Sequence, residues 1–263
     1  MSFPTPKEIA EKHQLWAKKA LGQNFIFDMN LTRKIANSAG SLTGLEVIEI
    51  GPGPGGLTQA LLEKDIKKLH AIEFDERAIN GLKELNSPKL EIINADALEI
   101  DLRSVAPAGC CVVANLPYNI GTRLLMDWLE YAQHFKSLTL MFQKEVAERI
   151  VAKPRTKDYG RVSVIAQWLC HAEILFDVPP TAFVPPPKVT SSIVKITPRE
   201  KPLFPADKKT LEMVVKTAFS QRRKMLRSTL KPLNVDFEKL GINPQARAEE
   251  LLIEDFCKLA NML

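Results

Sequence analysis

The residues best suited to chemistry follow the ends of short apolar runs. Gly51, Gly53 and Gly56 stand in G-x-G-x-x-G spacing directly before a helical pattern. This spacing permits a tight turn and lets a ligand that contains adenosine approach the backbone closely. Glu73 comes 20 residues after Gly53, where its carboxylate can accept hydrogen bonds from both ribose hydroxyls. Together these features predict a site for an adenosine-containing ligand.

Two prolines bear on which ligand this is. Pro52 and Pro54 lack the backbone N–H groups that a pyrophosphate would need as donors, which disfavours a dinucleotide. S-adenosylmethionine has no phosphate, because its charges lie on a sulfonium and an amino-acid group, and it is the expected cofactor. An NAD-dependent oxidoreductase stays the alternative from another enzyme class, because the glycine turn and Glu73 alone permit it.

Polar residues also end the next two apolar runs. Asp96 could accept a hydrogen bond from the adenine amino group, although an aspartate at such a position is also typical of a helix N-cap. Asn115-Leu-Pro-Tyr118 ends the fourth run and is the most specific motif in the chain.

This motif suits methyl transfer to an exocyclic adenine amine, a poor nucleophile whose lone pair is delocalised into the ring. Asn115 offers a side-chain oxygen as acceptor for the amine hydrogens. Pro117 biases Leu116 toward an extended conformation, which leaves the Leu116 carbonyl as a second acceptor, and Tyr118 can stack on the base. A sulfonium is a good leaving group, so positioning can carry most of the catalysis without a strong base. A strand-ending turn with a buried tyrosine is the alternative.

A proline-rich loop contains a second aromatic candidate. Residues 179–188 hold five of the 18 prolines, arranged around Phe183. A loop stiffened in this way could hold Phe183 ready to stack on a base flipped out of its helix. The alternative is a surface loop whose Phe183 belongs to the core.

Positive charge is concentrated near the C-terminus. Residues 199–231 hold ten Lys/Arg and three Asp/Glu, whereas residues 232–263 hold three and six. This basic segment indicates an anionic partner such as nucleic acid, with a solvated helix face as the alternative. The side chains expected to bind RNA are Arg222, Arg223, Lys224 and Arg227, together with Lys18 and Lys19. Arg222 lies on the apolar side of a helical wheel, where an internal ion pair is the alternative.

Short apolar runs alternate with helical patterns, which predicts βαβ units and a mostly parallel sheet covered on both faces. Strands are expected at 45–50, 68–74, 89–95, 110–115, 137–142, 171–177 and 191–197, and helices at 57–64, 76–84, 122–131, 144–153 and 162–169. Three prolines within residues 198–206 predict a boundary between domains 1–198 and 199–263. The second domain is expected to begin with one helix, or with two if Ser220 interrupts it as an N-cap.

The composition fits a globular protein of 263 residues, with 45% hydrophobic and 25% charged residues. No apolar stretch approaches the ~20 residues of a membrane helix, so no membrane partner is expected. The four cysteines lack C-x-x-C spacing, so we expect no metal site, and reduced thiols in a cytoplasmic protein.

With these residues identified, the sequence resembles, nearly from end to end, the KsgA-type rRNA adenine dimethyltransferase family. Residues 18–28 resemble the family's N-terminal cofactor motif, which implies that Gln23, Asn24 and Ile26 contact S-adenosylmethionine. Gly51, Glu73, Asp96 and Asn115 fall where the family binds the same ligand. Residues 115–118 match its N-L-P-Y motif, residues 183–189 its F-x-P-x-P-x-V loop, and residues 218–227 its helical-domain signature.

The resemblance implies a Rossmann-like class I methyltransferase fold with a seven-stranded, mostly parallel sheet and a small all-helical C-terminal domain. It implies dimethylation of the N6 amines of two adjacent adenosines near the 3′ end of small-subunit rRNA during ribosome assembly. We expect the protein to be a monomer. Methylases of large-subunit rRNA share the N-terminal half, whereas the helical domain favours the small-subunit enzymes. A non-catalytic RNA-binding assembly factor on the same fold is the alternative.

Overall fold

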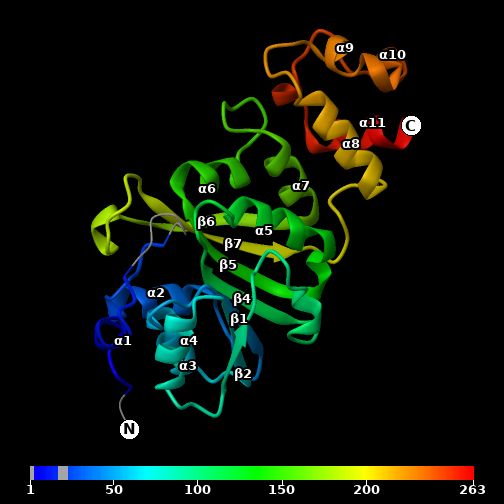
Figure 1. Ribbon diagram of the computed structural model, residues 1–263. Helices are drawn as coiled ribbons and strands as arrows, with labels where there is room; N and C mark the ends of the chain where they lie inside the picture. Colours follow the sequence, from blue (N-terminus) through cyan, green and yellow to red (C-terminus); the bar gives the residue numbers. More distant parts are fainter. Residues whose placement is uncertain (1–2, 17–22) are drawn as a thin grey trace. The chain divides into compact units, whose positions relative to one another are not determined.

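Within the part of the chain that the structure describes, seven strands form one sheet in the order β3-β2-β1-β4-β5-β7-β6 (Figure 1). The computed structural model describes residues 3–16 and 23–263. The strands are β1 Glu46–Ile50, β2 Lys68–Glu73, β3 Leu90–Asn94, β4 Cys110–Asn115, β5 Phe135–Gln143, β6 Cys170–Val178 and β7 Ser191–Pro198. The pairs among β1 to β5 are parallel, and β7 runs antiparallel to β5. The predicted α/β fold with a mostly parallel sheet is confirmed.

The strand order reverses direction beside β1. From β1 the chain builds outward through β2 to β3, and it then returns to place β4 on the other side of β1. The carboxyl ends of β1 and β4 therefore diverge at a topological switch point, where open α/β sheets bind their ligands.

Eleven α-helices occur in the described residues. They are α1 Pro6–Lys12, α2 Met29–Ser38, α3 Gly56–Leu62, α4 Glu76–Lys83, α5 Gly121–Trp128, α6 Lys144–Val151, α7 Arg161–Leu169, α8 Lys208–Ala218, α9 Leu226–Thr229, α10 Phe237–Leu240 and α11 Ile253–Met262. Short 3₁₀ turns are η2 Leu102–Ser104, η3 Leu129–His134, η4 Pro180–Ala182, η5 Lys231–Leu233 and η6 Ala248–Glu250. None of the helices in the described part of the chain combines the length and the apolar character that crossing a membrane requires.

Helices α1 and α2, before the first strand, were not predicted. Thr5 and Glu8 cap the start of α1 reciprocally, and the Asp28 side chain accepts a hydrogen bond from the Asn30 amide at the start of α2. Both helices precede the first strand, and α2 buries Ile35 against the sheet domain.

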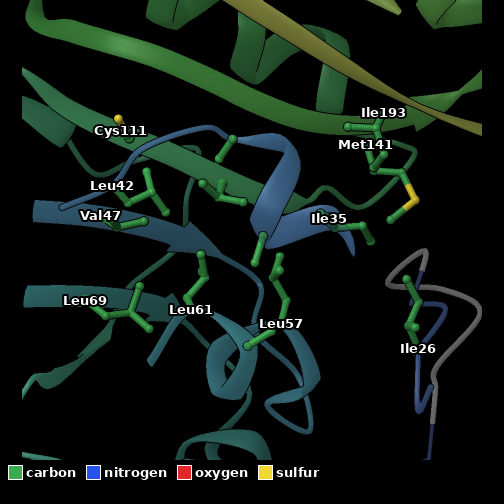
Figure 2. Packing of buried hydrophobic residues seen from close by; sticks show 14 of the residues in the cluster. Ile26, Ile35, Leu42, Val47, Leu57, Leu61, Leu69, Cys111, Met141 and Ile193 are labelled. Atoms are coloured by element: carbon green, nitrogen blue, oxygen red, sulfur yellow. The ribbon is translucent and has the colours of Figure 1, made fainter. Parts of the chain in front are cut away.

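One face of the sheet carries a large apolar cluster. Leu69, Val47, Cys111 and Met141 project from the neighbouring strands β2, β1, β4 and β5 and pack with residues of α2 and α3 (Figure 2). Fully burying a Leu, Val or Met side chain contributes about 1.5–3 kcal/mol, so this cluster holds the two helices firmly on the sheet. The opposite face is also covered, because the intervening residues of β1 and β2 are buried.

Strand alternation decides which polar residues share this face. Glu49 lies two residues after Val47 on β1, and Asn115 lies four residues after Cys111 on β4. Because side chains along a strand alternate between the faces, Glu49 and Asn115 project on the side of α2 and α3. Glu73 lies four residues after Leu69 on β2, so it projects on the same side of the sheet. Three polar side chains therefore gather at the carboxyl end of the sheet.

The chain divides into two compact units, residues 1–147 with 173–198, and residues 148–172 with 199–263. The second unit includes α7 as well as the C-terminal helices. Backbone and side-chain bonds explain this: the Trp168 indole donates to the Phe204 carbonyl at 2.7 Å, and the Leu203 amide donates to the Trp168 carbonyl at 2.8 Å.

Within the second unit, two helices replace the continuous basic helix that was one of the predicted alternatives. Helix α8 ends at Ala218, and α9 begins after Met225, which is its N-cap. Ser220 lies in the turn between them and is not the N-cap. Aromatic packing of Phe219 with Tyr159 and Phe256 fixes the start of this turn.

Candidate functional site

A cavity lies at the carboxyl ends of β1, β2, β3 and β4, at the switch point of the sheet. Residues that follow the four strands line it, together with parts of residues 23–26, α2 and α3. Every residue predicted to bind the cofactor lies in this lining: Gln23, Asn24, Ile26, Gly51, Gly53, Glu73, Asp96 and Asn115. The structure thus brings together side chains from five separate parts of the sequence.

The glycine turn packs closely against the segment before α2. Gly53 has a φ of +54°, and a Cβ atom there would lie 2.9 Å from the Phe25 ring. A Cβ atom on Gly56 would lie 2.7 Å from the Ile26 carbonyl oxygen. Both positions therefore need glycine so that residues 25–26 can close one side of the cavity.

Glu73 is held by backbone amides. Its Oε2 accepts from the Gly53 amide at 3.2 Å, and its Oε1 accepts from the amides of Phe74 and Asp75 at 2.9 and 3.0 Å. Burial raises the pKa of the Glu73 carboxyl, and these amides act in the opposite direction. The bonds fix the carboxylate at the mouth of the glycine turn, in the position expected for a ribose-binding group.

Asp96 has a more open setting. It is exposed, lines the cavity just after β3, and accepts a hydrogen bond from the Leu98 amide at 2.8 Å. Its carboxylate thus stabilises a local turn and also faces the cavity; no helix follows it directly, so the alternative of a helix N-cap is wrong.

Asn115 ends β4 and is tied to the N-terminal segment. Its Nδ2 donates to the Asn24 carbonyl at 3.3 Å. Because a carbonyl only accepts, this bond assigns the NH₂ side of the amide and turns Oδ1 the other way. The next residue, Leu116, is buried, and the Pro117 carbonyl accepts from the amides of Ile120 and Gly121 to start α5.

Tyr118 is half-buried at the edge of the cavity. Its hydroxyl forms a 2.6 Å hydrogen bond with the Ser191 hydroxyl, at the start of β7. Burial raises the pKa of Tyr118, so the phenol stays neutral at physiological pH. The bond fixes the direction of the aromatic ring, which suits a stacking surface.

Phe183 is a correction to the prediction of a second stacking surface. Its side chain is 2% exposed and belongs to the apolar cluster with Val178 and Ile193, and it is not among the residues that line the cavity. Burying a phenyl ring in the core stabilises the fold more than leaving it exposed in a loop, because burial removes a large apolar surface from water. Next to it, Val184 pairs with Phe25 by two backbone hydrogen bonds of 3.0 and 2.8 Å. The proline-rich loop therefore supports the N-terminal segment.

The predicted RNA-binding side chains either do not line this cavity or fall outside the described residues. Lys18 and Lys19 fall within residues 17–22, which the structure does not describe. Arg222, Arg223, Lys224 and Arg227 are all exposed in the second unit, in or just after the α8–α9 turn. Arg222 donates to the Lys157 carbonyl, so the predicted alternative of an internal ion pair is replaced by a bond to the backbone.

Two lining residues were missed in the sequence. Phe74 follows Glu73 and is 51% exposed, so its ring is available to a bound purine. Glu49 precedes the glycine turn and is 1% exposed. Its signal was a carboxylate between two isoleucines, directly before the glycine turn. The four cysteines are buried and unpaired, and the described residues contain no group of His, Cys, Asp and Glu that could hold a metal ion.

A model of the family described as ribosomal RNA adenine dimethylase matches residues 15–263. The chain belongs to this family. A protein of Ruegeria sp. (strain TM1040) named ribosomal RNA small subunit methyltransferase A is 50% identical over 272 residues, covering 100% of this chain and 97% of the relative. A protein of the same name from Mesorhizobium japonicum is 52% identical over 273 residues, with 98% of each chain covered.

Solved structures agree with this membership. A dimethyladenosine transferase from Plasmodium falciparum superposes with a TM-score of 0.77 at 28% identity, covering 89% of this dimethylase and 95% of that chain. The 23S rRNA methyltransferase ErmE gives a TM-score of 0.70 at 27% identity, covering 90% and 98%. The Rossmann-like methyltransferase fold is thus shown, and the cofactor of this dimethylase is S-adenosylmethionine.

The cavity of the dimethylase fits this cofactor. Glu49, Glu73 and Asp96 line it, whereas no Lys, Arg or His side chain lines it among residues 3–16 and 23–263. A carboxylate-rich cavity suits a cationic sulfonium and disfavours a pyrophosphate. The absence of amide donors at Pro52 and Pro54 acts in the same direction.

Proposed function

We propose that this protein dimethylates the N6 amines of two adjacent adenosines near the 3′ end of small-subunit rRNA during assembly of the small ribosomal subunit. The observation that carries the proposal is the orientation of the Asn115 amide, whose Oδ1 is turned away from the Asn24 carbonyl. The relatives about 50% identical to this chain carry the name ribosomal RNA small subunit methyltransferase A, which favours the small subunit as substrate.

We assign cofactor binding to the residues around the glycine turn. The cofactor supplies the methyl group as an electrophile on a sulfonium. Glu73 would hold the ribose hydroxyls, Asp96 the adenine amino group, and residues 23–26 the amino-acid end. Phe74 would cover one face of the adenine ring. These contacts would orient the methyl group toward the residues that end β4.

We assign the target amine to residues 115–118. Asn115 Oδ1 and the Leu116 carbonyl would accept the two amine hydrogens, which concentrates the nitrogen lone pair in the direction of the methyl group. Tyr118, held by Ser191, would stack on the target base. The nitrogen loses its proton to water after the transfer, so the site needs no strong base. Positioning of this kind lowers the barrier mainly through the entropy of alignment.

RNA recognition is assigned to residues 199–263, and methyl transfer to residues 1–198. Arg223, Lys224 and Arg227 are exposed, which suits contacts with phosphates. Lys18 and Lys19 keep their predicted role as further phosphate contacts. Because one chain contains all residues assigned to the cofactor and the amine, we place the enzyme as a monomer, in the cytoplasm where ribosomal subunits assemble. Light scattering of the purified protein tests the monomer.

The deciding experiment supplies labelled S-adenosylmethionine to small subunits that lack the modification. Digestion of their rRNA should yield labelled N6,N6-dimethyladenosine at two adjacent positions. Parallel arms contain large subunits and a protein with Asn115→Ala, and both should stay unlabelled. Label in large-subunit rRNA alone would overturn the small-subunit assignment. An absence of label in every RNA would overturn the catalytic assignment and favour a non-catalytic assembly factor.

A further inference from the structure

Glu49 is a buried carboxyl group that lacks a hydrogen-bond partner on one oxygen. It is 1% exposed, and its Oε2 accepts no hydrogen bond within the described part of the chain. The nearby Thr58 hydroxyl on α3 is likewise buried without a partner there. More than nine-tenths of buried polar groups in proteins are hydrogen-bonded, so this pair requires a reason. Glu49 also lines the cavity assigned to the cofactor.

The surroundings of Glu49 contain negative or neutral groups. Glu73 on β2 and Asp96 after β3 are the other carboxylates that line the cavity, and Tyr118 after β4 is neutral. Helices α2 and α3 contribute only uncharged lining residues, namely Thr32, Ile35, Gly56 and Leu57. A buried carboxylate in such a setting is costly to ionise unless a cation arrives.

Burial therefore raises the pKa of Glu49 to about 8. The Thr58 hydroxyl acts in the opposite direction, and the Glu73 carboxylate adds a smaller contribution to the increase. At neutral pH the empty cavity thus holds Glu49 mostly protonated. A positively charged ligand placed near it lowers that pKa again and drives the proton out.

We propose that Glu49 is the charge partner of the methyl donor and makes the cavity prefer the sulfonium donor over the neutral thioether product. This inference rests on the proposed assignment of the cavity to the cofactor. The donor and the product share adenine, ribose and amino-acid groups, and they differ only in the methyl group and in the positive charge on sulfur. The site can therefore distinguish the donor from the product through a side chain whose ionisation responds to the charge on sulfur.

The preference has a use in the catalytic cycle. When the methyl group passes to the amine nitrogen, the electron pair of the broken bond stays on sulfur, and the positive charge leaves the donor site. Glu49 then faces a neutral thioether as an ionised, buried carboxylate without a partner. It regains a proton from solvent or weakens product binding. Either outcome promotes exchange of product for fresh donor, which repeated methylation of two adenosines requires.

The test is isothermal titration of the enzyme with S-adenosylmethionine and S-adenosylhomocysteine at about pH 6.5, where the amino groups of both ligands are protonated. Titrations in buffers of different ionisation heat count the protons released. The wild-type protein should release more protons on binding the donor than on binding the product. Glu73 contacts the ribose that both ligands share, so its contribution cancels in this difference.

Glu49→Gln is the matched variant, because its amide resembles the protonated carboxyl in shape. It should reduce the preference for donor over product about tenfold, the equivalent of one pKa unit, and abolish the difference in proton release. Asp96→Ala is the control, because Asp96 faces the adenine common to both ligands. It should weaken both affinities by the same factor and leave their ratio unchanged.

The outcomes separate the two levels of the proposal. If Asp96→Ala weakens both ligands equally but Glu49→Gln leaves the donor preference unchanged, the role of Glu49 is wrong and the cavity assignment stands. If Asp96→Ala changes neither affinity, the cavity assignment itself is wrong. The proton count on the wild-type protein needs no variant, so equal proton release with both ligands refutes the inference even if Glu49→Gln does not fold.

Discussion

The side-chain NH₂ of Asn115 donates to the backbone carbonyl of Asn24 at 3.3 Å, which joins the end of β4 to the segment before α2. The bond crosses 91 positions of sequence and determines which side of the Asn115 amide faces the cavity. Because the segment before α2 also covers the glycine turn, closure of the cofactor cavity and orientation of the acceptor for the amine depend on the same stretch of chain.

Asn115→Ala should separate catalysis from cofactor binding. The substitution removes an acceptor for the target amine but little of the cavity lining. We expect the methyl-transfer rate to fall about 100-fold or more, and the affinity for S-adenosylmethionine to change only a few-fold. Single-turnover kinetics and calorimetry measure the two effects. Asn119→Ala, at an exposed position in the following turn, is the control and should behave as wild type. Equal loss of rate and affinity would contradict the assigned role.

Tyr118 should act mainly through its ring. Tyr118→Phe removes the 2.6 Å bond to Ser191 but keeps the stacking surface, so the rate should fall by at most about tenfold. Tyr118→Ala removes the stacking as well and should cost about 1–3 kcal/mol more in binding of the target base. Ser191→Ala deletes the other partner of the bond and should match Tyr118→Phe. A loss with Tyr118→Phe as large as with Tyr118→Ala would show that the hydroxyl itself is needed.

The basic turn should bind phosphate. In a protein with Arg223→Gln and Lys224→Gln, the affinity for small subunits should decrease. The slope of log affinity against log salt should become shallower by about 0.7–0.9 for each phosphate that the variant no longer neutralises. Filter binding at several salt concentrations measures both quantities. Lys83→Gln with Lys136→Gln makes the same change of charge at exposed positions outside residues 199–263. An equal effect of this control pair would mean that only net charge matters.

Glu49 should make the stability of the empty enzyme depend on pH. Its pKa in the folded state is about 8, above the ordinary carboxyl value of 4.5. The folded state therefore binds the proton more tightly than the unfolded state, and this contribution to stability is present below pH 4.5 and lost as the pH rises through 8. We expect Glu49→Gln to be the more stable protein above pH 8, by a few kcal/mol, and similar to wild type at acidic pH. Thermal or urea unfolding across this range measures the effect, and parallel curves for the two proteins would contradict it.

The sequence by itself determined the elements and the chemistry that depend on neighbours a few residues apart. Alternating apolar runs predicted all seven strands, and the glycine turn, Glu73 and residues 115–118 predicted the carboxyl edge of the sheet as the site. These signals are local, because strand burial, turns and helix starts depend on the spacing of a few side chains. The N-caps at Thr5 and Asp28 were local signals of the same kind, and they were available for α1 and α2.

Only the tertiary structure decided the features that depend on packing between distant segments. A phenylalanine has the same apolar side chain in a binding loop and in a core, so the sequence does not distinguish these locations. Phe183 is buried because it packs with Val178 and Ile193 in the apolar cluster on the sheet. The bonds from Trp168 and Leu203 that join α7 to the C-terminal unit depend on backbone positions that no local pattern encodes. The setting of Glu49 also depends on the tertiary structure. The described residues that line its cavity include no cation, so a charged Glu49 carboxylate has no partner among them.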